Sequence, residues 1–321
     1  MEKKDLRIVY FGTPDFAVDS LRRLVEGGYQ VVGVVTTPDK PVDRHKNKLQ
    51  PSPVKTYALE KGLPLLQPEK LKDEAFVEQL RQLRPDLQIV VAFRMLPEVV
   101  WGWPRYGTFN LHGSLLPQYR GAAPINWAII NGEKETGITT FFLEKDIDTG
   151  EIIYQTKINI GENDNFETIH DRLMLLGGDL VLKTVDAVLD GTISSVPQPS
   201  LSPEEMKPAP KIFRETCRIN WALPLNRVHD HIRGLSPVPA AWTLLNADNC
   251  ELSMKIFESS QEPAQHHLKA GTLITDGQSY LKVAVDGGFL VIHQLQIAGK
   301  KRMMVADFLR GWKNKGDAFV H

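Results

Sequence analysis

Apolar residues in the first half of the chain fall into two alternating kinds of segment. Short continuous apolar runs rich in β-formers, such as 6–11 (LRIVYF) and 86–93 (DLQIVVAF), are typical of strands buried on both faces. Between them lie segments with helix signals, as in 12–28, where Thr13 and Pro14 precede the helical pattern and Gly27 and Gly28 end it. Strand, helix and strand within the first 39 residues predict a βαβ unit and therefore a parallel sheet.

The pattern changes further along the chain. Segments 137–144 (GITTFFLE) and 151–160 (EIIYQTKINI) flank the turn KDIDTG and predict a hairpin, so that the sheet is mixed. Asp164, Asn165 and Glu167 resemble a capping signal for a long helix that ends near Gly191. We therefore expect an α/β fold over 1–191, with a Rossmann-like, mainly parallel sheet and flanking helices.

A Pro- and Ser-rich segment, 192–210, predicts a linker. Beyond it, short β-rich runs are separated by Gly and Asp, and Gly287–Gly288 is a hairpin signal. This pattern favours a small, OB-like β-barrel over 211–321, an architecture that often binds nucleic acid. We expect a catalytic domain over 1–191, a linker over 192–210 and a nucleic-acid-binding barrel over 211–321.

Composition narrows the class of protein. The chain has 321 residues, 42% of them hydrophobic, which fits two domains with real cores. No apolar run reaches the roughly 18 residues of a membrane span, and the start, MEKKDLRIVYFG, has no signal-peptide core. Cys217 and Cys250 make neither a disulfide framework nor a metal cluster. The expectation is a cytoplasmic protein without metal.

The first loop, FGTPDF, lacks the G-x-G-x-x-G spacing of a dinucleotide site, so a dinucleotide cofactor is not expected.

Net charge is −1, but basic residues cluster locally. Segment 38–53 combines prolines with basic and imidazole side chains and predicts an exposed loop, either a linker or a contact for a polyanion. The segment 298–315 contains six basic residues and one acidic residue, Asp307. This second cluster is either a solvated face or the footprint of a nucleic acid.

The segment 109–121, FNLHGSLLPQYRG, carries the candidate chemistry. In a strand, Asn110 and His112 point to one face and Phe109 and Leu111 to the other. The two polar groups lie at the carboxyl end of a strand, where open α/β sheets bind ligands. Such a pair is either a satisfied structural pair or a site in which the amide donates to a developing oxyanion and the imidazole handles a proton.

A partner for the imidazole is expected from the Asp-rich turn, in which Asp146 and Asp148 are both candidates. A carboxylate beside an imidazole favours the protonated ring. No G-x-S-x-G nucleophile elbow is present, which favours direct transfer between two bound substrates over a covalent enzyme intermediate.

Several motifs together resemble the folate-dependent formyltransferase family. They are FGTPDFA, LQPSPVK, FNLHGSLLPQYRGAAPINWAI, EKDIDTGEII, INWALP and QLQIAGKKRM, and the resemblance covers nearly the whole chain. It implies transfer of a formyl group from 10-formyltetrahydrofolate to the α-amine of methionine on initiator tRNA. Alternatives are formylation of a small amine, such as a purine precursor or a nucleotide sugar, and a non-catalytic RNA-binding module.

The resemblance also implies roles for individual residues. The catalytic group would be Asn110, His112 and Asp148, with Asp146 beside them. The folate site would include Ser114, Leu115, Leu116 and Pro117, together with Phe93 and Asp146. A departure lies at 92–97 (AFRMLP), where the family commonly has a Tyr-Gly-containing run against the pteridine and this chain has Phe93 and Arg94.

The implied partners are folate and the aminoacylated initiator tRNA, with no membrane, and the chain is expected to be a monomer. The family's basic loop meets the acceptor stem, so Arg44, Lys46 and Lys48 are expected RNA contacts. Further phosphate contacts are expected from Lys211, Lys300, Lys301 and Arg302. Phe11 and Phe16 are expected either to line a methionine pocket or to belong to the core.

Overall fold

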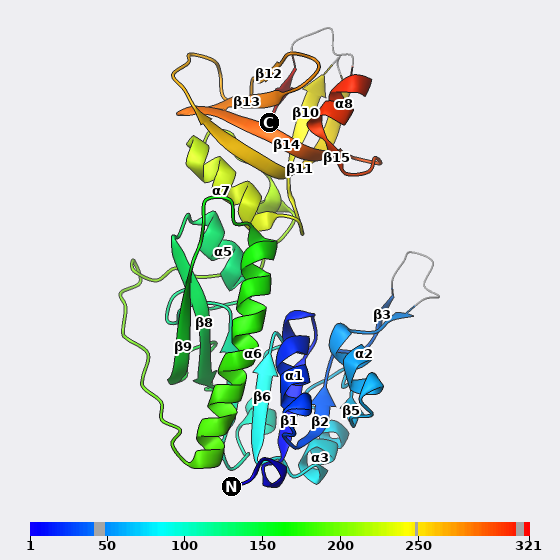
Figure 1. Cartoon of the computed structure of the whole chain (residues 1–321), viewed down its shortest axis with the longest axis vertical. Helices are drawn as coiled ribbons and strands as arrows, with labels where there is room; N and C mark the ends of the chain where they lie inside the picture. Colours follow the sequence, from blue (N-terminus) through cyan, green and yellow to red (C-terminus); the bar gives the residue numbers. More distant parts are fainter. Residues whose placement is uncertain (42–48, 248–249, 313–317) are drawn as a thin grey trace. The chain divides into compact units, whose positions relative to one another are not determined.

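A computed structural model describes residues 1–41, 49–247, 250–312 and 318–321. The chain packs as two compact units. The first comprises Met1–Gly121, Gly137–Ile158 and His170–Pro208, and the second comprises Ala122–Thr136, Asn159–Ile169 and Ala209–His321. The sequence colouring of Figure 1 helps to follow the three ranges that make up each unit. Among the described residues no helix is long and apolar enough to cross a bilayer.

The first unit is built on a seven-stranded sheet of order β5-β2-β1-β6-β7-β8-β9. Strands β1, β2, β5, β6 and β7 run parallel, while β8 is antiparallel to β7, so the predicted mixed sheet is confirmed. The strands are β1 (Ile8–Gly12), β2 (Val31–Val35), β5 (Leu65–Leu66), β6 (Leu87–Val91), β7 (Thr108–His112), β8 (Glu135–Phe142) and β9 (Ile152–Asn159). A short ribbon, β3 (Lys40–Pro41) with β4 (Leu49–Gln50), stands apart from this sheet.

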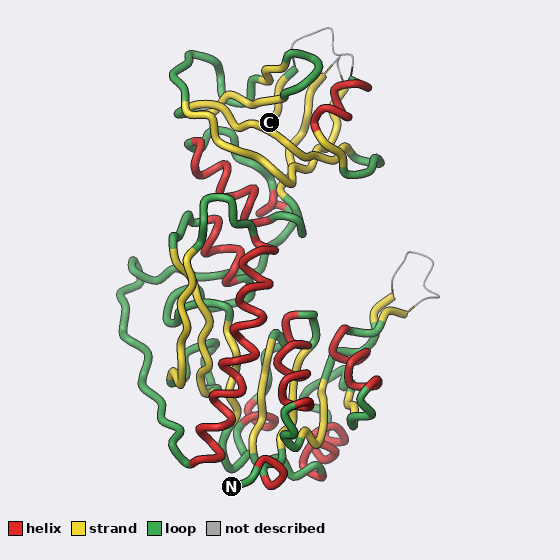
Figure 2. The backbone as a smooth tube through the Cα atoms, in the orientation of Figure 1, coloured by secondary structure: helices red, strands yellow, loops and turns green. Residues whose placement is uncertain are grey.

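Strand β1 is buried at all five positions because helices cover both faces of the sheet. Val9 and Phe11 pack in a cluster with residues of α3 and α4, whereas the Tyr10 hydroxyl donates to the Ala17 carbonyl of α1. The helices are α1 (Phe16–Glu26), α2 (Pro53–Glu60), α3 (Glu74–Gln82), α4 (Glu98–Trp101) and α6 (Phe166–Asp190), with a 3-10 turn η1 at Lys3–Asp5. Figure 2 shows the alternation of helix and strand along this unit.

Two predicted helix starts differ from the structure. Helix α1 begins at Phe16 after Asp15, and the buried Thr13 hydroxyl has no hydrogen-bond partner among the described residues, so Thr13 is not its cap. At the start of α6, Asn165 exchanges hydrogen bonds with Thr168: Thr168 N donates to Asn165 Oδ1 (2.9 Å) and Asn165 N donates to Thr168 Oγ1 (3.0 Å). The capping box is therefore closed by a hydroxyl instead of Glu167.

The second unit contains the predicted β-barrel. Its sheet has the order β12-β13-β14-β11-β10-β16, with β15 paired to β14. The two ends of the sheet meet where Leu273 N donates to Ala318 O (3.3 Å) and Val320 N donates to Gly271 O (2.9 Å). The strands are β10 (Ala241–Ala247), β11 (Cys250–Pro263), β12 (Leu273–Thr275), β13 (Leu281–Val285), β14 (Gly288–Ile297), β15 (Met303–Met304) and β16 (Phe319–Val320).

Three helices complete the second unit. They are α5 (Pro124–Ile130), α7 (Leu225–Leu235) and α8 (Val305–Gly311), with a 3-10 turn η2 at Glu215–Cys217. Ile130 of α5 and Ile232 of α7 belong to the same core cluster as the barrel strands. Asn126 of α5 donates its amide to the Gly234 carbonyl of α7 (2.8 Å), which fixes the two helices against each other.

Candidate active site

Strand β7 positions the two polar side chains that the sequence singles out. Phe109 and Leu111 are buried (0% and 3% exposed), as the alternation predicts. On the other face, Asn110 is half-buried and His112 is 6% exposed. Opposite them on β8 lie Phe141 and Thr139. The ring of Phe141 meets the imidazole of His112 edge-on at a centroid distance of 6.3 Å. The amide of Asn110 has no hydrogen-bond partner among the described residues.

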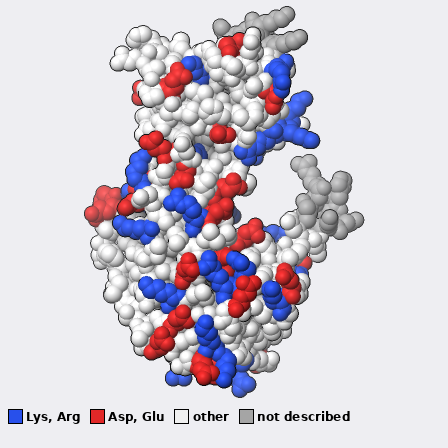
Figure 3. Space-filling model, in the orientation of Figure 1, with Lys and Arg blue, Asp and Glu red and all other residues white. Residues whose placement is uncertain are grey.

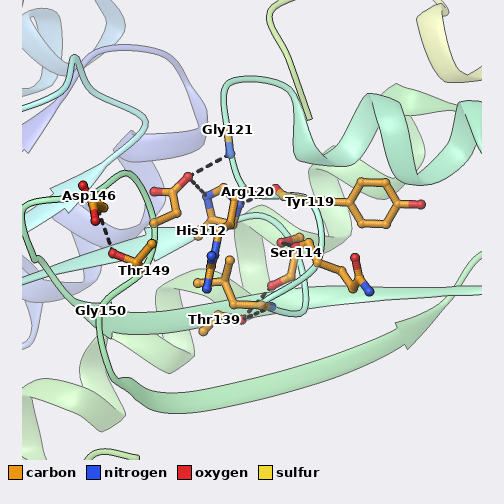
Figure 4. Close-up of polar contacts among 12 residues, drawn as sticks. His112, Ser114, Tyr119, Arg120, Gly121, Thr139, Asp146, Thr149 and Gly150 are labelled. Carbon is orange, nitrogen blue, oxygen red and sulfur yellow. Dashed lines mark hydrogen bonds and ion pairs between the residues drawn. The ribbon is translucent and has the colours of Figure 1, made fainter. Parts of the chain in front are cut away.

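His112 lies between two backbone loops, as Figure 4 shows. Its Nε2 is 2.8 Å from the Tyr119 carbonyl, and since a carbonyl can only accept, Nε2 carries the proton. Its Nδ1 is 3.8 Å from Asp148 Oδ2, a charge-pair distance too long for a hydrogen bond. Nδ1 is therefore the ring nitrogen able to act on a reacting atom.

Asp148 is the carboxylate that meets His112. Its Oδ2 accepts a hydrogen bond from the Gly121 amide (2.9 Å), which ties the Asp-rich loop to the end of the 113–121 turn. Asp146, the other sequence candidate, is exposed, and its backbone carbonyl accepts from the Thr149 hydroxyl (3.0 Å). The structure thus brings one of the two candidate carboxylates to the imidazole.

Non-glycine residues adopt left-handed backbone conformations around this site. They are Ala92 (φ 47°), Tyr119 (φ 60°) and Asp148 (φ 53°). Such residues cost roughly 1–3 kcal/mol each and persist where the surroundings over-determine them. Two of the three present groups directly to His112: the Tyr119 carbonyl and the Asp148 carboxylate.

The turn that follows His112 is held from within and from β8 and β9. The Ser114 hydroxyl donates to the Gln118 carbonyl (2.7 Å), and Thr139 Oγ1 donates to the Ser114 carbonyl (2.7 Å). Gln155 Nε2 donates to the Leu116 carbonyl (2.9 Å). Four of the residues expected in the folate site, Ser114, Leu115, Leu116 and Pro117, lie in this turn, with Leu116–Pro117 in the cis form.

A cavity of about 660 Å³ lies beside the 92–97 segment. Leu71, Leu96 and Trp101 give it apolar walls, and Lys72, Arg94 and Lys145 give it cationic ones. Phe93, in the same segment, packs edge-on against the ring of Phe11 (5.7 Å between centroids). Arg94 donates to the carbonyls of Pro68 (2.6 Å) and Glu69 (2.9 Å), and its buried Nε has no partner among the described residues.

The structure describes some of the expected RNA contacts. Arg44, Lys46 and Lys48 lie outside the described residues. The stem of their loop is anchored by Lys55, whose Nζ is 2.7 Å from Asp39 Oδ2, and this lysine together with Gln67 lowers the pKa of the Asp39 carboxyl.

On the second unit, Lys211 is exposed, with its Nζ 5.6 Å from the centre of the exposed Phe213 ring. Lys300, Lys301 and Arg302 are exposed in the β14–β15 connection, where basic side chains protrude from the surface (Figure 3). On the first unit, the face that Figure 3 presents carries both signs of charge interspersed.

The aromatic rings of the first loop belong to the core. Phe11 is 0% and Phe16 7% exposed, and the ring of Phe16 packs on His170 (5.2 Å between centroids). Among the described residues there is no group of three or more His, Cys, Asp or Glu placed to hold a metal ion.

Two family models cover most of the chain. The model described as "Formyl transferase" matches residues 6–185, and "Formyl transferase, C-terminal domain" matches 211–313. Methionyl-tRNA formyltransferases of Parabacteroides distasonis and Phocaeicola vulgatus are 61% and 65% identical to the chain, each over 98% of both sequences.

Solved structures share the fold of this chain. A sugar 3N-formyl transferase crystallised with dTDP and 5-N-formyl-THF has a TM-score of 0.63 at 20% identity, covering 92% of this chain and 99% of that one. HypX from Aquifex aeolicus in complex with tetrahydrofolic acid also has a TM-score of 0.63, at 18% identity, over 98% of this chain and 50% of that one. The chain therefore belongs to the formyl transferase family.

Proposed function

We propose that this protein transfers the formyl group of 10-formyltetrahydrofolate to the α-amine of methionyl initiator tRNA. The observation that carries the proposal is the identity of 61% to 65% with methionyl-tRNA formyltransferases over nearly the full length of both chains. The sugar formyltransferases among the solved structures share only the fold at about one fifth identity, so formylation of a sugar or another small amine is not favoured.

The proposed chemistry is a direct attack of the neutral amine on the formyl carbon. The amide of Asn110, which has no described partner, donates to the oxyanion that develops on the formyl oxygen. His112 contributes its Nδ1 edge, since Nε2 is committed to the Tyr119 carbonyl. Asp148 lies 3.8 Å from Nδ1 and orients the ring. The ring relays the proton lost by the attacking amine to the departing nitrogen, directly or through water, as the bond between that nitrogen and the formyl carbon breaks.

The formyl donor would lie between the 113–121 turn and the 92–97 segment. The cavity beside the 92–97 segment suits a folate, because its apolar residues fit an aromatic ring system and its cationic residues, Lys72, Arg94 and Lys145, fit carboxylates. Asp146, in the exposed part of the Asp-rich loop, would stand at the rim of this site. We propose a catalytic domain over 1–191, with the 192–210 segment and the barrel completing a monomeric protein that acts in the cytoplasm.

The proposed tRNA contacts combine the basic loop with the second unit. Arg44, Lys46 and Lys48 would meet the acceptor stem, and Lys211, Lys300, Lys301 and Arg302 would meet phosphates. Exposed lysines and arginines on a barrel suit a polyanion without sequence readout.

One assay tests the function. The protein is incubated with 10-formyltetrahydrofolate and either methionyl initiator tRNA or a small amine, and release of tetrahydrofolate is followed. We expect turnover with the tRNA and none with the small amine. In the His112→Ala variant we expect kcat with the tRNA to fall by roughly 10²-fold or more. Turnover with a nucleotide sugar or a purine precursor in place of tRNA would contradict the proposal.

A further inference from the structure

Residues 196–208, which lie in the segment expected to be a plain linker, run along the site as a strap. At one end, Val196 pairs with Ile152, the first residue of β9, through two backbone hydrogen bonds of 2.8 and 2.9 Å. At the other end, Tyr119 N donates to the Lys207 carbonyl (2.7 Å), and Lys207 N donates to Gln118 Oε1 (2.8 Å). The strap therefore contacts the same turn that presents its carbonyl to His112.

Gln198, two residues after Val196, joins the two loops on either side of His112. Its Oε1 accepts from Arg120 Nε (3.2 Å) and Nη2 (2.6 Å), while its Nε2 donates to the carbonyls of Asp148 and Gly150, both at 2.8 Å. Because a guanidinium can only donate and a carbonyl can only accept, the orientation of the amide is fixed by its partners at both ends.

The partners of Gln198 are neighbours of the groups that touch the imidazole. Arg120 follows Tyr119, whose carbonyl holds Nε2, and Asp148 is held by Gln198 through its own backbone carbonyl. Tyr119 and Asp148 are also the two residues with left-handed backbone conformations on either side of the ring. A single amide thus restrains both loops whose separation sets the gap between Nδ1 and the carboxylate.

We propose that Gln198 is a positioning residue of the formyl-transfer reaction, which sets the distance between His112 and Asp148 by bridging the Arg120 turn to the Asp148–Gly150 loop. The proposal rests on the proposed function, since it assigns a role for the reaction of that same site. It gives the 196–208 segment a part in chemistry in addition to joining two regions of the chain.

The test uses two substitutions in the full-length protein. Gln198→Glu keeps the size of the side chain and the acceptor for Arg120 but sets a carboxylate oxygen against two carbonyls. Gln198→Ala removes both contacts. We expect kcat to fall by roughly 10- to 100-fold in each, because small displacements of reacting groups are costly, with KM for tRNA and for the formyl donor changed less than about twofold. Ser200→Ala, an exposed position on the same strap, is the control and should match the unsubstituted protein.

A second readout separates positioning from general structure. In protein with ¹⁵N-labelled imidazole rings, the His112 resonances report the proton on Nε2, and both Gln198 substitutions should shift them while the thermal unfolding midpoint stays close to that of the Ser200→Ala control. Normal kcat with unshifted resonances would overturn the positioning role. So would a loss of kcat that follows only from loss of folded protein.

The His112→Ala variant separates a failure of the role proposed for Gln198 from a failure of the proposed catalytic groups. If it loses turnover while Gln198→Glu keeps it, only the role of Gln198 fails. If His112→Ala itself turns over normally, the assignment of the catalytic groups fails, whatever the Gln198 variants do.

Discussion

Asn110 differs from the other polar residues around the site because its side chain is held by no described neighbour. Asn126, in contrast, donates to the Gly234 carbonyl at 2.8 Å and is 8% exposed. An amide that stabilises the fold is hydrogen-bonded in the protein without substrate. An amide that stabilises a transition state gains its acceptor only when the reacting group is bound.

Replacing these two asparagines should therefore have opposite effects. Asn110→Ala is expected to lower kcat by roughly 10²–10³-fold with little change in stability, because it removes an oxyanion donor. Asn126→Ala is expected to lower the free energy of unfolding by about 1–3 kcal/mol, because it leaves a buried carbonyl unpaired. Steady-state kinetics and urea unfolding of both variants measure the contrast. Equal losses of activity would show that Asn110 has no special role.

Asp148 combines a charge with an unusual backbone conformation, and the two can be separated. Asn tolerates left-handed φ values and can still accept from the Gly121 amide, so Asp148→Asn removes the charge and keeps the loop. We expect kcat to fall by about 10²-fold with an unchanged unfolding midpoint, since the imidazole loses the negative charge beside its Nδ1. Asp146→Asn, in the exposed part of the loop, is the matched control, and full activity in Asp148→Asn would refute the charge role.

At this scale the sequence predicts some groups of the site and not others. The two-residue spacing of Asn110 and His112 places them on one face of any strand, so they could be found without a structure. Spacing alone leaves Asp146 and Asp148 open, because both lie in one turn, and the family resemblance favours Asp148. The Tyr119 carbonyl is a backbone group and has no sequence signal. Gln198 lies 86 positions beyond His112 in a Pro-rich segment, where the pattern predicts only a linker.

At the scale of elements, the strands buried on both faces were predicted most closely, since a continuous apolar run leaves little choice of structure. Helix starts were predicted less well. Thr13 does not cap α1, and Thr168 takes the part expected of Glu167, because local side-chain hydrogen bonds depend on where the preceding loop leaves the backbone.

Helix α7 buries a polar stripe that the apolar pattern does not reveal. His229, Asp230 and Arg233 are 6% to 7% exposed. Arg233 pairs with Asp230 (2.7 Å) and donates to the Asp164 carbonyl (2.8 Å), and His229 Nδ1 is 3.1 Å from Ser259 Oγ. Burial, helped by the charge of Arg233, lowers the pKa of His229 below its usual value.

This stripe predicts a pH dependence of stability. Below an unfolded-state pKa of about 6.5, the unfolded chain binds a proton at His229 that the folded chain resists, so the free energy of unfolding falls as the pH falls through this region. His229→Gln should make that fall shallower between about pH 5 and pH 6.5, as measured by urea unfolding. At pH 8, where the imidazole is neutral in both states, the difference between the two proteins should no longer vary with pH. An unchanged slope in the variant would argue against a contribution from His229.

For the whole molecule, the predicted fold class is confirmed: a mixed α/β sheet and a closed antiparallel barrel. Alternating strand and helix signals in the first half, and short β-rich runs separated by Gly and Asp in the second, were sufficient to predict this fold class. The sequence did not predict that α5 and residues 159–169 belong to the compact unit of the barrel, because such packing depends on contacts between segments distant in sequence.

The proposed tRNA interface makes a prediction at this scale. The triple change Lys300→Gln, Lys301→Gln and Arg302→Gln should reduce the magnitude of the slope of log K against log salt for tRNA binding by about 2–3. The reason is that a protein with fewer phosphate contacts releases fewer counterions when it binds. Binding is measured at several salt concentrations. Glutamine at Lys4, Lys61 and Lys70, all exposed on the first unit, removes the same charge and serves as control. Equal slopes in the two triple variants would place the RNA elsewhere.

The strap also bears on where this polypeptide can be divided. A protease or a genetic truncation that separates the two family-model regions would naturally cut between residues 186 and 210. A fragment that ends at Asp190 would retain the seven strands and the long helix but lose Gln198 and the backbone partner of Tyr119. A fragment that ends at Pro208 would keep both. Two pieces that differ by 18 residues of Pro-rich sequence should therefore differ in the order of the loops around His112, although both contain every residue of the proposed catalytic group.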